Sequence, residues 1–266
     1  MTTPSTNSSG VGAIRIALAT VVLAILAAGA FGLWYILLRP SGPAAVADAS
    51  LVVPSRAPAT SSAGSSAAAT SSASSSSTTP SGGIDGTWNV DTSIGSFSDF
   101  SDSFVGYRVQ EQLASIGGNT AVGRTPAVSG SLTIAGTKVT AVTIQADLTG
   151  LKSDDNRRDG QLSHQGLETS TYPTATFSLT SPIDLGSVPA DGTEVSVSAT
   201  GKLTLHGQTK DVQIPLKAKL SGNTIVVTGS LEITFADYGI SKPNSFAVLS
   251  IADTGTLELQ LFFTKA

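Results

Sequence analysis

The sequence predicts an all-β domain over residues 84–266, with antiparallel strands that fit a closed barrel or a two-sheet sandwich. Short runs of alternating apolar and polar residues follow one another through this stretch, separated by Gly, Asn, Asp and Pro. Because side chains alternate sides along a strand, each run has one face suited to burial and one suited to water. The clearest example is Gly201–Leu220, in which two alternating arms flank the turn His206-Gly207-Gln208-Thr209. Roughly eight to ten such runs at this spacing are typical of a β-sandwich or a β-barrel.

The candidate strands share this alternation. In chain order they are Gly86–Val90, Ser103–Leu113, Val128–Ile134, Val142–Leu148, Phe177–Leu179, Val195–Val197, the two arms of the hairpin, Ile225–Phe235 and Leu257–Phe263. The stretch Ser153–Ser170 is too polar and charged for a strand, so we expect a loop with one short helix. Pro215 lies on the outward face of its strand and removes a ladder hydrogen bond, so we expect a bulge or a sheet edge there.

The N-terminal segment predicts a membrane anchor. Ile16–Leu38 is a run of 23 residues without a charge, and Trp34 and Tyr35 lie near its end. About 20 apolar helical residues cross the hydrocarbon core of a membrane, and aromatic residues are typical of its interface. We therefore expect a transmembrane helix at 16–38, after a cytoplasmic tail at 1–15. The alternative is a signal peptide cleaved at Ala45-Val46-Ala47, although the apolar region of a signal peptide is only about 7–15 residues long.

Residues 39–83 predict a flexible linker. From Ser55 to Gly83 the chain is almost wholly Ser, Ala, Thr, Pro and Gly, a composition that buries no core and behaves as a disordered tether. Arg15 precedes the apolar run and Arg39 and Arg56 follow it, so the positive-inside rule does not determine the orientation of the predicted helix in the membrane. Ser- and Thr-rich stalks are typical of the cell exterior. We therefore expect a single-pass protein of the cell membrane whose C-terminal domain lies outside the cytoplasm.

The composition excludes several partners and chemistries. Residues 84–266 carry 12 Lys and Arg against 18 Asp and Glu, a net charge of −6, so we expect no nucleic-acid partner. The absence of cysteine excludes disulfides, thiolate nucleophiles and Cys-ligated zinc. The two histidines, His164 and His206, are 42 residues apart and fall short of a metal site. No G-x-S-x-G, P-loop or dinucleotide fingerprint occurs, so we expect neither an enzyme nor a cofactor.

Both a closed barrel and a two-sheet sandwich fit the strand pattern. Each hides the edges that an open antiparallel sheet exposes, and periodicity alone does not separate them. We favour the barrel, because closed barrels of about eight strands can hold one small ligand. The single long loop and the tethered, exported setting suit a carrier.

Five motifs occur in order along the domain. They are Trp88-Asn89-Val90-Asp91, Arg158-Asp159-x-x-Leu162, Tyr172-Pro173-Thr174-Ala175-Thr176-Phe177, Gly201-x-Leu203-Thr204-Leu205-His206-Gly207-x-Thr209-Lys210 and Asp237-Tyr238-Gly239-Ile240. Across the whole domain, this series resembles the YceI family of lipocalin-like, polyisoprenoid-binding proteins. The resemblance implies export and an extended antiparallel barrel whose apolar interior holds the tail of an isoprenoid or other amphiphilic lipid, without chemistry being done on it.

The resemblance has one extension and one departure. The anchored chain, with its long FVGYRVQE strand, looks like the actinobacterial members of the family. Many members carry a His a few residues after the aromatic that matches Phe104, whereas the run here is Phe104-Val105-Gly106-Tyr107-Arg108. We therefore assign no head-group recognition to that position.

The predicted ligand-binding residues are the apolar side chains in phase with the barrel interior. They are Phe104, Leu132, Ile144, Leu148, Phe177, Leu203, Ile214, Leu231, Ile233 and Phe235. Arg157, Arg158 and His164 are the candidates for an anionic head group, since Arg offers planar bidentate donors. The alternative is that Arg158 and Asp159 only fix the loop. Two other functions stay open, namely a structural or interaction β-domain with a packed core, and a lyase or hydrolase using His164 or His206.

Overall fold

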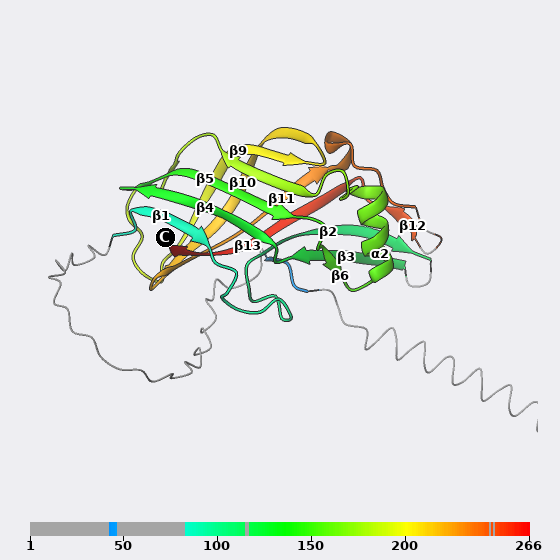
Figure 1. Cartoon of the computed structure of the whole chain (residues 1–266), viewed down its shortest axis with the longest axis horizontal. Helices are drawn as coiled ribbons and strands as arrows, with labels where there is room; N and C mark the ends of the chain where they lie inside the picture. The colour runs from blue at the N-terminus through cyan, green and yellow to red at the C-terminus, as the bar shows by residue number, and fades with distance from the viewer. Residues whose placement is uncertain (1–42, 47–82, 115–116, 245, 247) are drawn as a thin grey trace, which may run out of the picture. The chain divides into compact units, whose positions relative to one another are not determined.

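The computed structural model describes residues 43–46, 83–114, 117–244, 246 and 248–266, which all belong to one compact unit (Figure 1). The predicted transmembrane helix and most of the predicted linker lie outside these residues. In the described part of the chain, no helix is both long and apolar enough to cross a membrane.

Thirteen strands and three short helical segments make up the described domain. The strands are β1 (Gly86–Val90), β2 (Phe104–Leu113), β3 (Gly117–Thr125), β4 (Val128–Ala135), β5 (Lys138–Asp147), β6 (Lys152–Ser153), β7 (Thr174–Leu179), β8 (Ile183–Asp184), β9 (Glu194–Leu205), β10 (Gln208–Ser221), β11 (Thr224–Thr234), β12 (Val248–Ile251) and β13 (Thr254–Lys265). The helical segments are α2 (Asn156–Gln161), the π-helical turn η2 (Leu162–Gly166) and the 3-10 turn η3 (Phe235–Tyr238). The predicted all-β class is confirmed.

The strands close into an antiparallel barrel, so the two-sheet sandwich, which the sequence pattern also allowed, is excluded. Around the ring the order is β1-β4-β5-β7-β9-β10-β11-β13, and β1 pairs with β13 to close it. Along β13, β1 pairs with Phe263–Lys265 and β2 pairs with Thr256–Gln260. β3 then pairs with β2, and the short β6 with β3. The helix α2 lies at the end of the barrel beside β3 and β6 (Figure 1).

The sequence prediction misses β3 and the short strands β6, β8 and β12. It misses β3 because GGNTAVGRT contains three glycines and no run of alternating apolar residues. Of the bulge or sheet edge expected at Pro215, the bulge is absent, since β10 stays in register with β9 through the pair Pro215 and Ser198. The pairing of β10 with β11 begins only at Leu216. Pro215 therefore lies at the end of that ladder, an edge position that proline tolerates.

The register of β13 separates the inner from the outer face of the barrel wall. The inward set is Leu257, Leu259, Leu261 and Phe263, and the outward set is Thr256, Glu258, Gln260 and Phe262. The connection between β1 and β2 covers part of the outward set. Gln260 Nε2 donates to the carbonyls of Phe100 (3.2 Å) and Asp102 (2.9 Å), and Phe262 packs with Ile94. Both faces of β13 are therefore largely removed from water.

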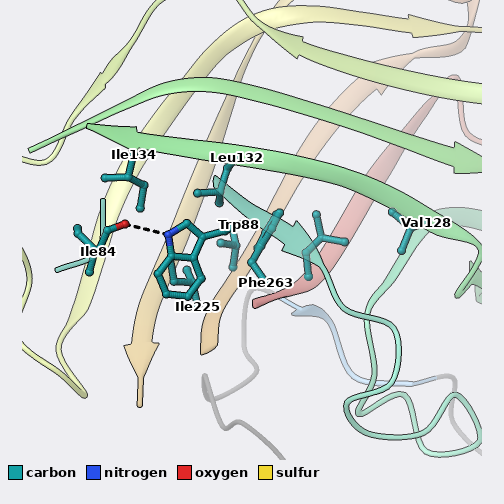
Figure 2. Close-up of a cluster of buried hydrophobic side chains, with 9 residues drawn as sticks. Ile84, Trp88, Val128, Leu132, Ile134, Ile225 and Phe263 are labelled. Atoms are coloured by element: carbon teal, nitrogen blue, oxygen red, sulfur yellow. Dashed lines mark hydrogen bonds between the residues drawn. The ribbon is translucent and has the colours of Figure 1, made fainter. Parts of the chain in front are cut away.

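Buried apolar side chains form two clusters at opposite ends of the barrel. The first contains Trp88, whose Nε1 donates to the carbonyl of Ile84 at 2.8 Å (Figure 2). Its other members are Val128, Leu132, Ile134, Ile225, Val227, Leu261 and Phe263. The second consists of Ala146, Leu148, Leu167, Leu203, Leu205, Ile233 and Tyr238. Leu220, near the β10–β11 turn, packs against the first cluster, whereas Leu205 of the second lies beside the β9–β10 turn.

Candidate ligand-binding site

Between the two clusters, the apolar side chains on the inner face of the barrel are only half-buried. Ile144 and Leu216 pack against the first cluster and Leu231 and Leu257 against the second, yet each keeps part of its surface accessible. In a close-packed interior, side chains in the middle of inward-facing strands are fully buried. The apolar inner wall is therefore not fully covered by other side chains along the middle of the barrel.

Two inward-facing glycines let bulky side chains lie along the barrel wall. A Cβ on Gly201 of β9 would come within 2.5 Å of the Phe177 ring, which belongs to the neighbouring strand β7. A Cβ on Gly229 of β11 would come within 2.4 Å of a methyl group of Leu216 on β10. Real Cβ atoms do not approach this closely, so glycine is required for both contacts. Phe177 and Leu216 therefore lie across the neighbouring strands.

Nine of the ten predicted lining residues lie on the inner face. Leu132 belongs to the first cluster and Ile144 packs on it, while Leu148, Leu203 and Ile233 belong to the second cluster. Leu231 and Phe235 pack on the second cluster, Ile214 shares its phase with Leu216, and Phe177 is paired with Ile144 and Leu203.

Phe104 is the exception and lies on the outer face. It pairs with Gln260 of β13, which points outward, whereas its neighbour Val105 packs against both inner clusters. Its ring is 1% exposed and lies beneath the guanidinium of Arg124, 4.2 Å from the ring centroid. The prediction placed Phe104 inside. Phe104 and Val105 are both apolar, so alternation does not identify which face of β2 points into the barrel.

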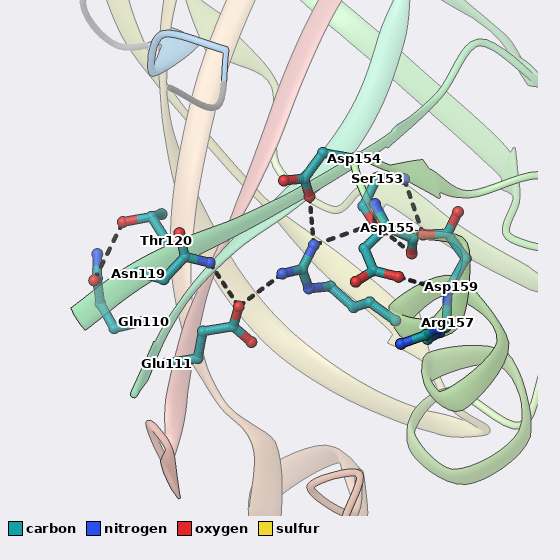
Figure 3. A network of polar contacts seen from close by, with 10 residues as sticks. Gln110, Glu111, Asn119, Thr120, Ser153, Asp154, Asp155, Arg157 and Asp159 are labelled. Atoms are coloured by element: carbon teal, nitrogen blue, oxygen red, sulfur yellow. Dashed lines mark hydrogen bonds and ion pairs between the residues drawn. The ribbon is translucent and has the colours of Figure 1, made fainter. Parts of the chain in front are cut away.

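The polar loop is fixed to the barrel by Arg158 and Asp159. Arg158 Nη2 lies 2.7 Å from Glu111 Oε1 on β2, and its other terminal nitrogen pairs with Asp154. Asp159 accepts hydrogen bonds from the backbone N–H (2.9 Å) and hydroxyl (2.6 Å) of Ser153. Burial lowers the pKa of Arg158, but Glu111 and Asp154 together raise it by more. Figure 3 shows this network, which commits Arg158 to holding the loop against β2.

The other two head-group candidates are exposed. Arg157 is an exposed residue of α2, and His164 is an exposed residue of η2. The side chain of Arg157 lies by the helix, apart from the contact between Glu111 and the loop (Figure 3). Among the residues that the structure describes, neither Arg157 nor His164 has an ion-pair partner of the kind that fixes Arg158.

His206 joins three of the sequence motifs at one end of the barrel. Its Nδ1 lies 3.0 Å from the carbonyl oxygen of Tyr238, and its Nε2 lies 3.0 Å from Glu168 Oε2. The ring of Tyr172 packs on it with centroids 4.4 Å apart. His206 itself is 8% exposed and has a left-handed φ of 51°. Since both ring nitrogens of His206 have partners, the motifs that carry the family resemblance build a corner of the fold, and this imidazole is already engaged.

A buried charged cluster on the outer face escapes sequence analysis. Glu258 Oε1 lies 2.6 Å from Arg108 Nε, and Glu258 Oε2 lies 3.3 Å from Arg124 Nη2. The side chains of Glu258 and Arg124 are 2% and 4% exposed. Burial lowers the pKa of Arg124, an effect that Glu258 opposes. The sequence signal for this cluster is weak, because its charged residues lie on three separate strands and β3, which carries Arg124, was not predicted as a strand.

Asp102 lies beside this cluster, and its burial makes the ionised carboxylate unfavourable. It is 4% exposed, its Oδ1 has no hydrogen-bond partner among the described residues, and burial raises its pKa to about 6, against an ordinary value of 3.8. When the pKa of a carboxyl is higher in the folded than in the unfolded state, the folded state loses stability as the pH rises from the unfolded pKa to the folded pKa. The folded domain therefore gains stability from this group when the pH falls from about 7 toward 4.

We expect Asp102→Asn to stabilise the domain at neutral pH and to flatten this pH dependence. The shift of about two pKa units sets an upper bound on the gain in unfolding free energy of about 3 kcal/mol at pH 7.5, which falls to about 1.6 kcal/mol at pH 5. Urea unfolding of both proteins at the two pH values measures the difference. Asp99→Asn is the matched control, because hydrogen bonds from Ser101 lower the pKa of Asp99, so its loss should destabilise. Equal pH dependence in the wild type and Asp102→Asn would contradict the prediction.

The comparisons with known proteins agree on the fold. A model of the YceI-like domain matches residues 88–263. A polyisoprenoid binding domain from Saccharophagus degradans, implicated in plant cell wall breakdown, is similar at 22% identity and a TM-score of 0.52, covering 68% of this chain and 99% of that one. Burkholderia cenocepacia BcnA is similar at 23% identity and a TM-score of 0.46, covering 60% and 95%. The Campylobacter jejuni YceI protein is similar at 15% identity and a TM-score of 0.45, covering 54% of this chain and 84% of that one.

No curated protein matches the sequence. At the identities of the solved structures, what is shared is the fold. The family match is broader, because it runs from Trp88 in β1 to Phe263 in β13 and so includes every strand of the closed ring. The chain therefore belongs to the YceI-like family.

Proposed function

We propose that this protein is a membrane-tethered, extracytoplasmic binding protein that holds an isoprenoid or other amphiphilic lipid inside its barrel. The observation that carries the proposal is the half-buried apolar lining between the two packed clusters. A hydrocarbon tail in this space would remove both its own surface and the lining from water.

The energetics favour a long, flexible tail. Burial of apolar surface contributes about 25 cal/mol per Å², or about 0.8 kcal/mol per methylene group. A chain of a few carbons therefore gains little, whereas a tail of several isoprene units gains enough to offset its loss of freedom. The proposed lining residues are the nine inward-facing residues of the predicted set, from Leu132 on β4 to Phe235 at the start of η3.

The head group is proposed to meet the exposed side chains of the polar loop. Arg157 and His164 are the available candidates, because Arg158 is already paired with Glu111 and Asp154. Arg157 offers the planar donors that suit a phosphate or carboxylate.

Family membership supports a lipid ligand for this chain. The similar domain from Saccharophagus degradans is described as polyisoprenoid binding, and at 22% identity it supports the proposal through the shared barrel. The membrane tether rests on the sequence alone, through the apolar run at 16–38 and the Ser-rich stretch that follows it. We propose that the chain is a membrane-anchored member of the family, similar to the anchored actinobacterial members. It would bind its ligand without catalysing a reaction on it.

The test is to purify the full chain from its own host and analyse it by native mass spectrometry in detergent. The chain should stay with the membranes through a high-salt wash, because an apolar span is not held by charge. It should carry an added mass that corresponds to a lipid with a long hydrocarbon tail. A chain found free in the medium and beginning at Asp48 would overturn the tether. A chain that carries no lipid and takes up no long-chain isoprenoid would instead favour a structural domain without a small ligand.

A further inference from the structure

A short piece of the predicted linker is bound to the outside of the barrel. Residues 43–46 contact the cluster formed by Arg108, Arg124 and Glu258, which we call the outer charged cluster. Arg124 Nη2 donates to the carbonyl of Ala44 at 2.9 Å, and an Arg108 guanidinium nitrogen donates to the carbonyl of Pro43. The backbone N–H of Val46 donates to Glu258 Oε1 at 3.2 Å. Three backbone groups of the segment are thus bound by three charged side chains.

The charge of the cluster explains why it binds a backbone segment. Two guanidinium groups share the one carboxylate of Glu258 in a largely buried position, so their remaining N–H groups need acceptors outside these ion pairs. A buried charge needs hydrogen-bond partners beyond its counterion. The two carbonyls of the segment supply such acceptors, and the N–H of Val46 supplies a donor to the shared carboxylate.

The side chain at position 46 adds an apolar contact. Val46 is 2% exposed, in a stretch of the sequence that is otherwise rich in small residues. Burying a valine side chain contributes about 1.5–3 kcal/mol. The segment is therefore held by its backbone and by one apolar side chain.

We infer that the outer charged cluster is a docking surface for the chain's own segment Pro43–Val46, and that docking shortens the tether between the membrane and the barrel. The first part stands on the contacts alone, and the second rests on the proposed transmembrane helix. From Leu38 to Pro43 the chain spans at most about 18 Å. With the segment released, the tether runs from residue 39 to residue 83, and its maximum reach is several times longer. Docking thus switches a long tether to a short one.

The first test measures amide hydrogen exchange in the full chain in detergent. Peptides covering 43–46 should exchange at least about tenfold more slowly than peptides from 60–80, because the Val46 N–H is bonded and buried. Val46→Asp should abolish this protection, since it places a charge in the buried position, while exchange in the barrel strands stays unchanged. Val53→Asp is the matched control, the same substitution in the same stretch, and should leave the protection of 43–46 intact.

Three results would overturn the docking. They are fast exchange of 43–46 in the wild type, protection that survives Val46→Asp, and protection that fades on dilution, which would assign the contact to exchange between copies. None of these outcomes depends on a bound lipid or on the membrane helix, so the docking can fail or hold independently of the proposed function.

The second test measures the tether in vesicles. The chain has no cysteine, so a single Gln110→Cys label reports one place, two residues from Arg108 on the same face of β2. Energy transfer from this label to a fluorescent lipid should fall when Val46→Asp releases the segment and should not fall with Val53→Asp. Equal transfer in all three proteins would overturn the shortening of the tether. No transfer in any of them would overturn the membrane anchor of the proposed function, and with it the shortening.

Discussion

Replacing Glu258 by alanine is expected to destabilise the domain by about 3–5 kcal/mol. The substitution leaves Arg108 and Arg124 close together without their shared carboxylate, and Arg124 is almost fully buried. Removal of one partner from a buried ion pair is costly because the remaining charge stays desolvated and uncompensated. Urea unfolding followed by the fluorescence of Trp88, in a Trp34→Phe background, measures the change.

The control for this prediction is Glu232→Ala on the neighbouring strand β11. Glu232 is exposed, and substitutions of exposed surface residues typically stay within about 0.5 kcal/mol of the wild type. A loss for Glu258→Ala as small as that of the control would show that the outer charged cluster contributes nothing to stability, contrary to its burial.

Ile144→Trp is expected to abolish binding of a long-chain isoprenoid while leaving stability close to that of the wild type. Ile144 points into the half-buried middle of the barrel, opposite Gly130 on β4 and Phe177 on β7. An indole ring there would occupy the space proposed for the lipid tail. Overpacking a filled core costs about 1–3 kcal/mol, whereas accessible space admits the ring without this cost. Titration with the isoprenoid and urea unfolding provide the two measurements.

Thr143→Trp is the matched control, because Thr143 is the exposed, outward-facing neighbour on the same strand. It adds the same ring on the other face of the wall, so it should leave lipid binding unchanged. A clear loss of stability in Ile144→Trp, together with no lipid binding in the parent chain, would sink the carrier assignment and favour a packed structural domain.

Local alternation predicts a strand well where one face meets water. The β9–β10 hairpin shows this, since its outward positions are exposed and its inward positions apolar, and the structure pairs it in one register from Glu194 to Lys219. The same rule fails for β2, whose Phe104 is covered from outside by Arg124. When both faces of a strand are buried, alternation carries no information about which face is inner.

The sequence by itself determined the all-β class, the antiparallel hairpins and most of the inward-facing apolar set, because these follow from side-chain alternation along each strand. Only the tertiary structure decided which charged groups meet. Arg108, Arg124 and Glu258 are separated by up to 150 residues, and their contact depends on β13 pairing with β2 and β2 with β3. The docked segment at 43–46 is likewise invisible in the sequence, since it is bound mainly through its backbone, and every residue carries the same backbone groups.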